Sequence, residues 1–516
     1  MRSLLPWVGE ELGMRASQKK DFSSPKRLQN KTHLENTPQE PPEAGAKFSI
    51  GGGKRFAFGF SQLMKPLKLS MMGVRGVIGQ GLTPELVVDF AQAFGTYVEG
   101  GTVLVSRDTR PSGDMMRSAV LSGLIATGCR VVDLGVCPTP SLQLAVADRP
   151  DAVGGIAISA GHNAVEWNAL KFVASDGKLL NSYQGEELLD VYHLGQFRGA
   201  RWNELKAVEY DDSAIERHIQ RILSILDVER IRAAGFRVAV DCCNGACSIS
   251  TPRLLQELGC EVITINDDPN ELFPHDPEPN PGNMSQLRAL VKASRADVGF
   301  CHDADGERLA LVTEDFRALS EEYTLAIIAD QVLSRTPGTV VCNVSTSLAL
   351  EKIAARYNSN VIRTRVGQAY VVEGMIASGA VLGGEGSGGV IFPKLHYAHD
   401  SMAAIGHILG FMAETRKPLS ALAEAVPSYF MIKEKIYCPP EQVYSVLQRI
   451  RESVEENPHG AEVDPTEGIR LLWEDAAVHV RASITEPLIR IISEAQTQER
   501  AEELAGLMIA MVQTCL

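Results

Sequence analysis

The feature that most constrains the fold of this chain is an alternation of helix and strand patterns that restarts twice. The first round comprises expected helices at residues 84–97 and 112–127 and expected strands at 102–106, 130–134 and 152–158. The second and third rounds repeat the alternation over residues 213–265 and 321–364. Such alternation predicts βαβ units, in which a mostly parallel sheet is covered by helices on both faces.

Counted from the start of one round to the start of the next element set, each unit spans roughly 100–150 residues, the size of an ordinary domain. We therefore expect an α/β fold with three related α/β domains whose sheets are mixed but mostly parallel. The C-terminal part differs, because its expected strands follow one another closely and only two helical patterns, at residues 441–454 and 497–512, lie among them. This predicts an additional C-terminal α+β domain. The expected domain boundaries are 66–210, 211–316, 317–427 and 428–516.

Composition and charge argue against several classes of protein. The 516 residues carry a formal net charge of −14, which argues against nucleic acid as the main partner. No apolar run approaches the roughly 18–20 residues of a membrane-spanning helix, and no signal peptide is recognised, so we expect a cytoplasmic protein without a membrane partner. Residues 1–65 are rich in Lys, Pro, Ser, Asn and Gly, a composition typical of a disordered N-terminal extension.

The first segment that suggests chemistry is Ser159-Ala160-Gly161-His162-Asn163, at the end of an apolar run. Nine residues after His162 lies Lys171, embedded in the sequence E-W-N-A-L-K-F. A lysine in such a setting can act as a general acid or base if burial or a nearby cation lowers its pKa. Arg75, in the turn Gly73-Val74-Arg75-Gly76, is the candidate for that cation. A solvated lysine and a surface arginine are the simpler alternatives for each residue taken singly.

A second segment, Asp303-Ala304-Asp305-Gly306-Glu307-Arg308, follows the apolar run 298–301. The carboxylates Asp303, Asp305 and Glu307 can all point at one centre, and oxygen ligands suit a hard cation such as Mg²⁺. Arg308 would add a positive charge on the phosphate side. A plain acidic turn is the alternative, but alternating carboxylates directly after a strand favour a metal loop.

Two further segments carry groups that can bind a sugar phosphate. The glycine-rich stretch at residues 383–389 holds Glu385 and Ser387, an acceptor and a donor for hydroxyl groups. A flexible turn is the alternative, although a glutamate among glycines is unusual for a turn. Residues 481–490 offer cationic and hydroxyl side chains that fit a phosphate dianion: Arg481, Ser483, Thr485 and Arg490.

Taken in this order, the segments resemble those of the α-D-phosphohexomutases, which move a phosphoryl group between two hydroxyls of one sugar phosphate. The corresponding family phrases are G-x-R-G, T/S-A-S-H-N-P, D-G-D-A-D-R, G-E-x-S-G and R-x-S-G/N-T-E-P-x-x-R, and residues 107–112 match a sixth, G-R-D-T-R-x-S. The resemblance spans residues 73–490. It implies four domains around a central cleft, which contribute a serine loop, a metal loop, a sugar loop and a phosphate loop.

The resemblance also implies a function. The phrases E-W-N-A-L-K-F and G-E-G-S-G-G-V-I-F-P are most similar to those of the archaeal-type phosphoglucosamine mutases. Interconversion of glucosamine 6-phosphate and glucosamine 1-phosphate is therefore expected first, and that of glucose or mannose phosphates next. Mg²⁺ is the implied cofactor, and a hexose 1,6-bisphosphate is a candidate activator. The expected partner is a small sugar phosphate, bound by a monomer or a homodimer.

The sequence departs from the family pattern at the most reactive position. Gly161 stands where the family carries the phosphorylated serine, and it has no hydroxyl to carry a phosphoryl group. Ala164 replaces the family's proline, Glu307 its third metal-binding aspartate, and Ile484 a glycine or asparagine of the phosphate loop. A β-branched residue is poorly suited to positive φ, so we expect the phosphate loop to differ in shape.

Three hypotheses follow from Gly161. In the first, Ser159 carries the phosphoryl group, although two residues of extended chain separate Cα atoms by about 6–7 Å. In the second, a bisphosphate or a bound phosphate replaces the phosphoenzyme. In the third, the chain is a catalytically impaired homologue that binds sugar phosphates or has a regulatory role. In the first two hypotheses the candidate catalytic residues include His162, Lys171 and Arg75. Ser159 joins them in the first hypothesis, and the position of Gly161 in the second.

Overall fold

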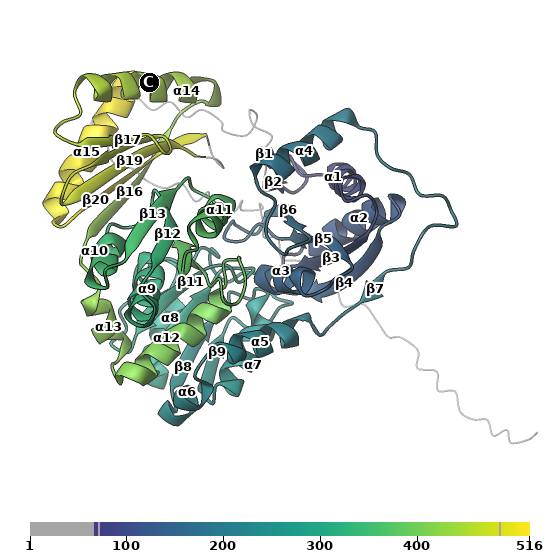
Figure 1. Ribbon diagram of the computed structural model, residues 1–516, viewed down its shortest axis with the longest axis horizontal. Coiled ribbons are helices and arrows are strands. Elements are labelled where there is room, and N and C mark those ends of the chain that lie inside the picture. The colour runs from purple at the N-terminus through teal and green to yellow at the C-terminus, as the bar shows by residue number, and fades with distance from the viewer. Residues whose placement is uncertain (1–66, 71–72, 484–486) are drawn as a thin grey trace, which may run out of the picture. The chain divides into compact units, whose positions relative to one another are not determined.

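The computed structural model describes residues 67–70, 73–483 and 487–516 (Figure 1). The expected N-terminal extension at residues 1–65 lies outside the described residues, as do Ile484 and Thr485 of the phosphate loop. The described chain forms four β-sheets. Its helices include none that combines the length and apolar character needed to cross a membrane.

The first sheet has seven strands in the order β1-β2-β6-β5-β3-β4-β7. These strands are β1 (Leu67–Ser70), β2 (Gly73–Val77), β3 (Thr102–Arg107), β4 (Arg130–Val136), β5 (Ala152–Ile158), β6 (Trp167–Ala174) and β7 (Glu209–Tyr210). The helices of this part are α1 (Pro84–Tyr97), α2 (Gly113–Ala126), α3 (Thr139–Ala147) and α4 (Ser182–Leu194).

The second and third sheets have four strands each, in the orders β11-β10-β8-β9 and β13-β12-β14-β15. The second contains β8 (Arg237–Asp241), β9 (Glu261–Ile265), β10 (Val298–His302) and β11 (Leu309–Thr313), with α5 (Ala214–Ser224), α6 (Val228–Ala234), α7 (Cys247–Glu257) and α8 (Ser285–Ser294). The third contains β12 (Thr339–Asn343), β13 (Asn360–Thr364), β14 (Leu382–Glu385) and β15 (Gly389–Ile391), with α9 (Glu322–Arg335), α10 (Ala349–Arg356), α11 (Gln368–Ser378), α12 (Ser401–Thr415) and α13 (Leu419–Ala425).

The fourth sheet is antiparallel throughout, in the order β16-β20-β19-β18-β17. It contains β16 (Phe430–Tyr437), β17 (Glu462–Asp464), β18 (Ile469–Leu472), β19 (Ala476–Ala482) and β20 (Leu488–Ala495), with α14 (Pro440–Glu456) and α15 (Gln498–Cys515). The structure therefore confirms the expected C-terminal α+β domain.

One four-strand arrangement occurs in each of the first three sheets. The sets β4-β3-β5-β6, β9-β8-β10-β11 and β13-β12-β14-β15 share an order in which three parallel strands are followed by one antiparallel strand. This confirms the prediction of three related α/β domains with mixed, mostly parallel sheets.

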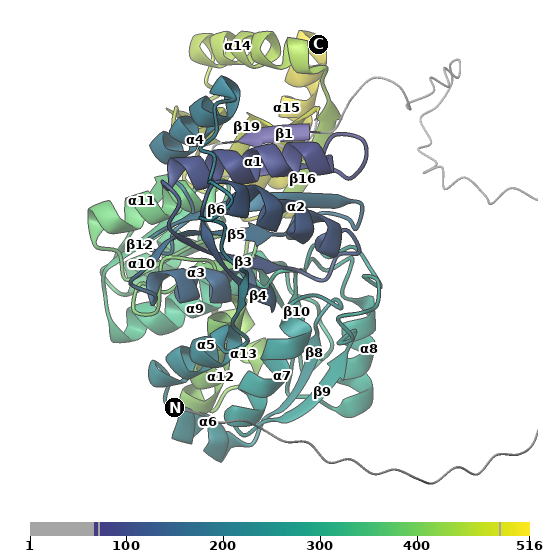
Figure 2. The ribbon, with the colours of Figure 1, turned by 90° about the vertical axis from the view of Figure 1, so that its right-hand side faces the viewer.

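The strands of the first sheet bury side chains on both faces, as a sheet covered by helices on both sides must. Val103 and Val105 of β3 pack with Phe94 of α1 in a core that also includes residues of α2. Figure 2 shows α1 and α2 side by side over this sheet. Leu104, between them, belongs to the core on the opposite face, with Leu142 of α3. At the start of α1, Thr83 accepts the N–H of Leu86 at 3.4 Å and Pro84 is the first helical residue, so the expected bounds are confirmed.

Each of the three related domains presents the segment singled out from the sequence at the same place, the hairpin between its third and fourth strands. These hairpins are residues 159–166 between β5 and β6, 303–308 between β10 and β11, and 386–388 between β14 and β15. They follow the carboxyl ends of parallel strands, where open α/β sheets bind ligands. In the fourth sheet β19 and β20 pair antiparallel, and the connection between them, of which Ser483 and Pro487 lie in the described chain, is referred to as the fourth hairpin.

Candidate active site

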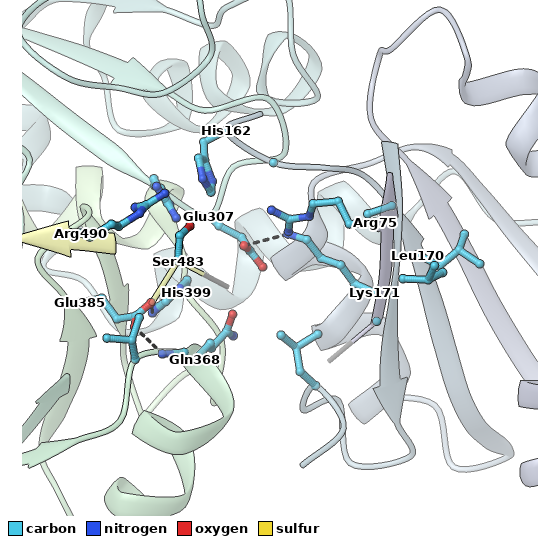
Figure 3. Close-up of a pocket in the computed structure, with 18 of the residues that line it drawn as sticks. Arg75, His162, Leu170, Lys171, Glu307, Gln368, Glu385, His399, Ser483 and Arg490 are labelled. Carbon is cyan, nitrogen blue, oxygen red and sulfur yellow. Dashed lines mark hydrogen bonds and ion pairs between the residues drawn. The ribbon is translucent and has the colours of Figure 1, made fainter. Parts of the chain in front are cut away.

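Residues from all four sheets border one cavity with two adjoining compartments, of about 230 Å³ and about 570 Å³ (Figure 3). The smaller compartment is lined by Arg75, Gly161, Lys171 and Glu307, among others. Ser387 borders the larger one. Both compartments are bordered by His162, Arg308, Val366, Glu385, Arg481 and Arg490. The structure thus brings most of the candidate site residues to one place.

The backbone of the first hairpin is braced by one buried arginine, Arg110. Its Nη2 donates to the carbonyl oxygens of Gly161 and Asn163, both at 2.7 Å. Its Nη1 donates to the carbonyl oxygens of Ala164 at 2.5 Å and Trp167 at 2.9 Å. Because these bonds reach main-chain atoms, they do not depend on which side chain residue 161 carries.

Ser159 is also a structural part of this hairpin. Its hydroxyl donates to Asp108 Oδ2 at 2.6 Å and accepts the N–H of Gly161 at 2.9 Å. Asp108 in turn accepts a hydrogen bond from Arg110 Nε at 2.9 Å. Ser159 is only 2% exposed and is not among the described residues that line either compartment. Its hydroxyl therefore fixes the hairpin instead of facing the cavity.

Gly161 adopts a φ of +54°, in the left-handed region, which costs an L-residue with a side chain roughly 1–2 kcal/mol. A Cβ atom built at this position would lie 3.4 Å from Asp305 Oδ1 and 3.8 Å from Asp303 Oδ2. The first hairpin therefore presents residue 161 to the carboxylates of the second hairpin.

Each of those three carboxylates has one oxygen engaged and one oxygen without a partner in the described chain. Asp303 Oδ1 accepts the N–H groups of Glu307 and Arg308, both at 3.0 Å. Asp305 Oδ2 and Glu307 Oε2 are bound by Lys171 Nζ, at 2.7 Å and 2.8 Å. The buried oxygens without a hydrogen-bond partner are Asp303 Oδ2, Asp305 Oδ1 and Glu307 Oε1.

These unpartnered oxygens fit a hard cation. Burying a carboxylate without a partner is costly, and burial together with the charge of Asp305 raises the pKa of Asp303 well above its usual value. A donor set made only of carboxylate oxygens suits Mg²⁺. Two more compact groups of potential metal ligands occur elsewhere in the described chain: His218, His396 and Asp400, and Asp241, His275 and Cys301. In the acidic hairpin, the ammonium group of Lys171 lies between Asp305 and Glu307.

The position of Lys171 corrects one expectation from the sequence. A nearby cation was expected to lower its pKa, with Arg75 as the candidate. Burial does act in that direction, but the charges of Asp305 and Glu307 outweigh it and raise the pKa of Lys171 above its usual value. Arg75 instead donates from Nη1 to Asn163 Oδ1 at 2.6 Å. Lys171 is therefore a charged ammonium group in this arrangement of the site.

His162, the residue after Gly161, has the opposite electrostatic setting. Burial and the charges of Arg308 and Arg75 lower the pKa of His162 well below its usual value, and Lys171 and Arg490 act in the same direction. The imidazole is therefore neutral at pH 7. Its ring points into the cavity between Arg490 and Arg75 (Figure 3).

The third and fourth hairpins supply the opposite wall. Glu385 Oε1 accepts the amide of Asn343 at 2.6 Å and the N–H of Gly367 at 2.9 Å, which fixes its carboxylate beside the cavity. Arg481 is 8% exposed, and its buried Nε has no acceptor in the described chain. Ser483 and Arg490 also line the smaller compartment. A guanidinium group with an unused donor suits an anionic ligand.

The structure adds residues that sequence reasoning did not assign to the site. Thr139 Oγ1 donates to Asp305 Oδ2 at 2.7 Å, and His399 and Gln368 line the smaller compartment. Arg110 lies in the segment that resembles the family phrase G-R-D-T-R-x-S. The sequence therefore marked this residue, but it did not indicate that its side chain holds the first hairpin in shape. Thr139 lies in no motif, and only the packing of α3 beside the second hairpin reveals it.

Comparison with known protein families matches all four parts of the chain. The α/β/α domains I, II and III of phosphoglucomutase/phosphomannomutase match residues 67–198, 216–316 and 320–430, and the C-terminal domain of the same family matches residues 439–510.

Curated relatives match over nearly their whole length. A probable phosphoglucosamine mutase of Methanopyrus kandleri is 38% identical over 451 residues, covering 86% of this chain and 97% of the relative. A phosphoglucomutase/phosphomannomutase of Thermococcus kodakarensis is 36% identical over 451 residues, covering 86% and 98%.

A solved structure shares the fold. The crystal structure of a phosphoglucomutase/phosphomannomutase family protein from Burkholderia thailandensis matches with a TM-score of 0.75 and 27% identity, over 86% of this chain and 96% of that one. With the fold, the hairpins and these matches in agreement, the chain belongs to the phosphoglucomutase/phosphomannomutase family.

Proposed function

We propose that this protein is a phosphohexomutase that interconverts a hexose 6-phosphate and a hexose 1-phosphate, with glucosamine phosphate as the first candidate and glucose or mannose phosphate next. One observation carries the proposal: a single cavity joins Glu307, one of three carboxylates of the second hairpin that each have an unpartnered oxygen in the described chain, to a wall of arginine side chains. The names of the similar proteins, phosphoglucosamine mutase and phosphoglucomutase/phosphomannomutase, support the same reaction class.

Mg²⁺ would be held by Asp303, Asp305 and Glu307 through the oxygens that lack hydrogen-bond partners. When bound, it would stabilise the negative charge that develops on a phosphoryl group in transit. Lys171 then has a second task, because its ammonium group can donate a proton to a sugar oxygen as the P–O bond breaks. Its contacts with Asp305 and Glu307 place that group at the edge of the cavity.

The opposite wall would bind the rest of the substrate. Glu385 and Ser387 offer an acceptor and a donor for sugar hydroxyls. Arg481, Ser483 and Arg490 would hold the phosphate that is not reacting, and Arg308, at the border of both compartments, would face the one that is. Two phosphate-binding regions in one cavity suit a substrate that reacts first at one end and then at the other.

The missing hydroxyl at Gly161 requires a different carrier for the phosphoryl group. The burial of Ser159 and its bond to Asp108 weigh against the first hypothesis. We therefore propose that turnover requires an added hexose 1,6-bisphosphate. A non-catalytic sugar-phosphate-binding role is the second candidate function, and Gly161 is the specific observation that favours it.

A coupled assay of the full chain tests these alternatives. The 6-phosphates of glucosamine, glucose and mannose would each be supplied with Mg²⁺, with and without the cognate 1,6-bisphosphate, and again with EDTA. The proposal expects turnover of at least one sugar that requires both Mg²⁺ and the bisphosphate. Tight binding of a sugar phosphate by calorimetry with no turnover in any combination would favour the non-catalytic role.

A further inference from the structure

The reactive group next to Gly161 in the chain is the imidazole of His162, a half-buried residue. It follows Gly161 in the chain and borders both compartments of the cavity, so it can be reached from either end of a bound bisphosphate. Figure 3 shows its ring pointing toward the space between Arg490 and Arg75, above Glu307. Within the described part of the chain, its ring nitrogens make no hydrogen bond or ion pair with protein, and both can therefore meet a ligand.

Other candidate nucleophiles in the cavity are engaged or lie elsewhere. Lys171 is an ammonium group held by two carboxylates, so it has no electron pair to donate. The hydroxyl of Ser159 is buried against Asp108. His399 lies beside Glu385, with 3.9 Å between its Nε2 and Glu385 Oε2, on the sugar-binding wall. Ser387 belongs to the sugar-binding hairpin and borders the larger compartment, whereas Gly161 lines the smaller one.

The charges around His162 suit a residue that accepts a phosphoryl group. Four cationic side chains act on its ring: Arg308, Arg75, Lys171 and Arg490. They disfavour the imidazolium form, which leaves an electron pair on one ring nitrogen at pH 7. The same four charges would stabilise a phosphate group once it is attached.

We propose that His162 carries the transferred phosphoryl group in place of the missing serine. This inference rests on the proposed mutase function. One ring nitrogen forms a P–N bond as a P–O bond of the hexose 1,6-bisphosphate breaks. The sugar oxygen takes up a proton and the other ring nitrogen releases one, so the products are phosphorylated His162 and a hexose monophosphate. Phosphorylated His162 then transfers its phosphoryl group to the free 1-hydroxyl of an incoming hexose 6-phosphate, which forms the bisphosphate as the P–N bond breaks and the hydroxyl proton returns to the ring. The bisphosphate next gives its 6-phosphoryl group to His162, and the hexose 1-phosphate leaves, which completes the isomerisation.

The stability of the enzyme–phosphate bond gives a direct test. The full chain would be mixed with Mg²⁺ and glucose 1,6-bisphosphate, and the reaction would be stopped with alkaline denaturant. The mass of the intact protein would then be measured by mass spectrometry before and after brief acid treatment. A P–N bond survives alkali and breaks in acid, whereas a serine phosphate ester survives acid. We expect a mass gain of one phosphoryl group that disappears in acid and that peptide mapping places on His162.

Three variants sharpen the test. His162→Asn should lose the acid-labile label and lower kcat at least about 100-fold, while glucosamine 6-phosphate still binds by calorimetry. His399→Asn, a second histidine of the same cavity, should keep the label. Gly161→Ser combined with His162→Asn should acquire an acid-stable label on the introduced serine, which shows that the rest of the cavity is competent.

The outcomes separate this inference from the proposed function. Turnover by the unmodified chain without an acid-labile label overturns the role of His162 and leaves the mutase function standing. An acid-stable label on Ser159, or an acid-labile label that survives His162→Asn, also overturns it. If the unmodified chain shows neither label nor turnover while Gly161→Ser shows both, the inference and the proposed function fail together. Should His162→Asn fail to fold, the acid sensitivity and the mapped position of the label in the unmodified chain still decide.

Discussion

The hairpins of the first and second α/β domains occupy equivalent places in two related sheets, but different groups hold them in shape. The first hairpin is braced from outside, because Arg110 binds three of its carbonyl oxygens and that of Trp167 at the start of β6. The second is held both from within, because Asp303 accepts two N–H groups of its own loop, and from outside, because Thr139 donates to Asp305 and Ser401 to the carbonyl oxygen of Gly306. The comparison teaches that the first hairpin can change its reactive side chain without losing its shape, whereas in the second the same carboxylates supply both shape and chemistry.

This difference explains how a family site can persist around Gly161. Removal of a serine side chain leaves the Arg110 bonds unchanged, since they reach only main-chain atoms. The carboxylates of the second hairpin still face the emptied position, with Asp305 Oδ1 3.4 Å and Asp303 Oδ2 3.8 Å from where a Cβ atom would lie. The following predictions test the two halves of the comparison in order of decreasing effect.

The largest effect is expected from removing the outer brace. Arg110→Met deletes the bonds to the first hairpin and leaves Asp108 buried without its cation. The free energy of unfolding should fall by about 3–5 kcal/mol, measured by urea denaturation. The control is Arg149→Met, which breaks only a partly exposed ion pair with Asp151. This variant should change the free energy of unfolding by less than about 1 kcal/mol. Equal effects of the two variants would contradict the bracing role of Arg110.

The second hairpin should control activity instead. Asp305→Asn removes a charge that faces residue 161 and that binds Lys171, so turnover should fall by about 100–1000-fold. Mg²⁺ should also cease to raise the Tm of this variant. The matched control is Asp176→Asn, an exposed carboxylate paired only with Lys178, which should leave turnover and the Mg²⁺ effect intact. Unchanged Mg²⁺ dependence in Asp305→Asn would show that the cation binds elsewhere.

The fourth sheet extends the comparison to pH. His479 in β19 is buried, and burial together with the charge of Arg481 lowers its pKa to about 3. An unfolded histidine titrates near pH 6.5, so below that pH the unfolded state binds the proton and the folded state does not. The neutral His479 therefore stabilises the folded state fully above pH 6.5, and this stabilisation is lost as the pH falls from 6.5 toward 3.

The contribution of His479 to the free energy of unfolding should fall by about 2 kcal/mol between pH 7 and pH 5. Comparison of His479→Gln with the unmodified chain, by urea denaturation at both pH values, isolates this contribution. The variant should lose less stability on acidification. If both chains lose the same amount, His479 does not remain neutral in the folded protein.

The smallest expected effect concerns the backbone at Gly161. Its φ of +54° favours glycine, and a Cβ atom would meet no atom closer than 3.4 Å. Gly161→Ala should therefore lower the free energy of unfolding by about 1 kcal/mol, through conformation and not through a clash. Gly199→Ala, at a glycine in open space and without a positive φ, should be neutral. If Gly161→Ala lowers the free energy of unfolding by well over the roughly 1–2 kcal/mol that a left-handed backbone costs, the hairpin cannot accept a side chain at this position.

Much of the fold was predictable because its elements have clear local signals. The bounds of α1 coincide with the expected range, since Thr83 caps the helix and Pro84 is its first residue. The helix α12 was missed, because ten of its fifteen residues are buried and a helix apolar on all sides has no amphipathic period to detect.

The site was predictable as a set of loops but not as a set of contacts. The motifs located the four hairpins, because their glycines, carboxylates and arginines are adjacent in sequence. The pKa of Lys171 was predicted in the wrong direction, since its partners Asp305 and Glu307 lie more than 100 residues away along the chain. The bracing by Arg110, 51 to 57 residues from its acceptors, was hidden for the same reason.

The central claim is that the first hairpin supports phosphoryl transfer without a hydroxyl at residue 161. The most direct measurement is the initial rate of glucosamine 6-phosphate isomerisation by the unmodified chain, with Mg²⁺ and the 1,6-bisphosphate, beside Gly161→Ser at equal concentration. We predict a rate for the unmodified chain that is far above the rate without protein and is abolished by EDTA. Turnover by Gly161→Ser alone, with the unmodified chain at background, would contradict the claim.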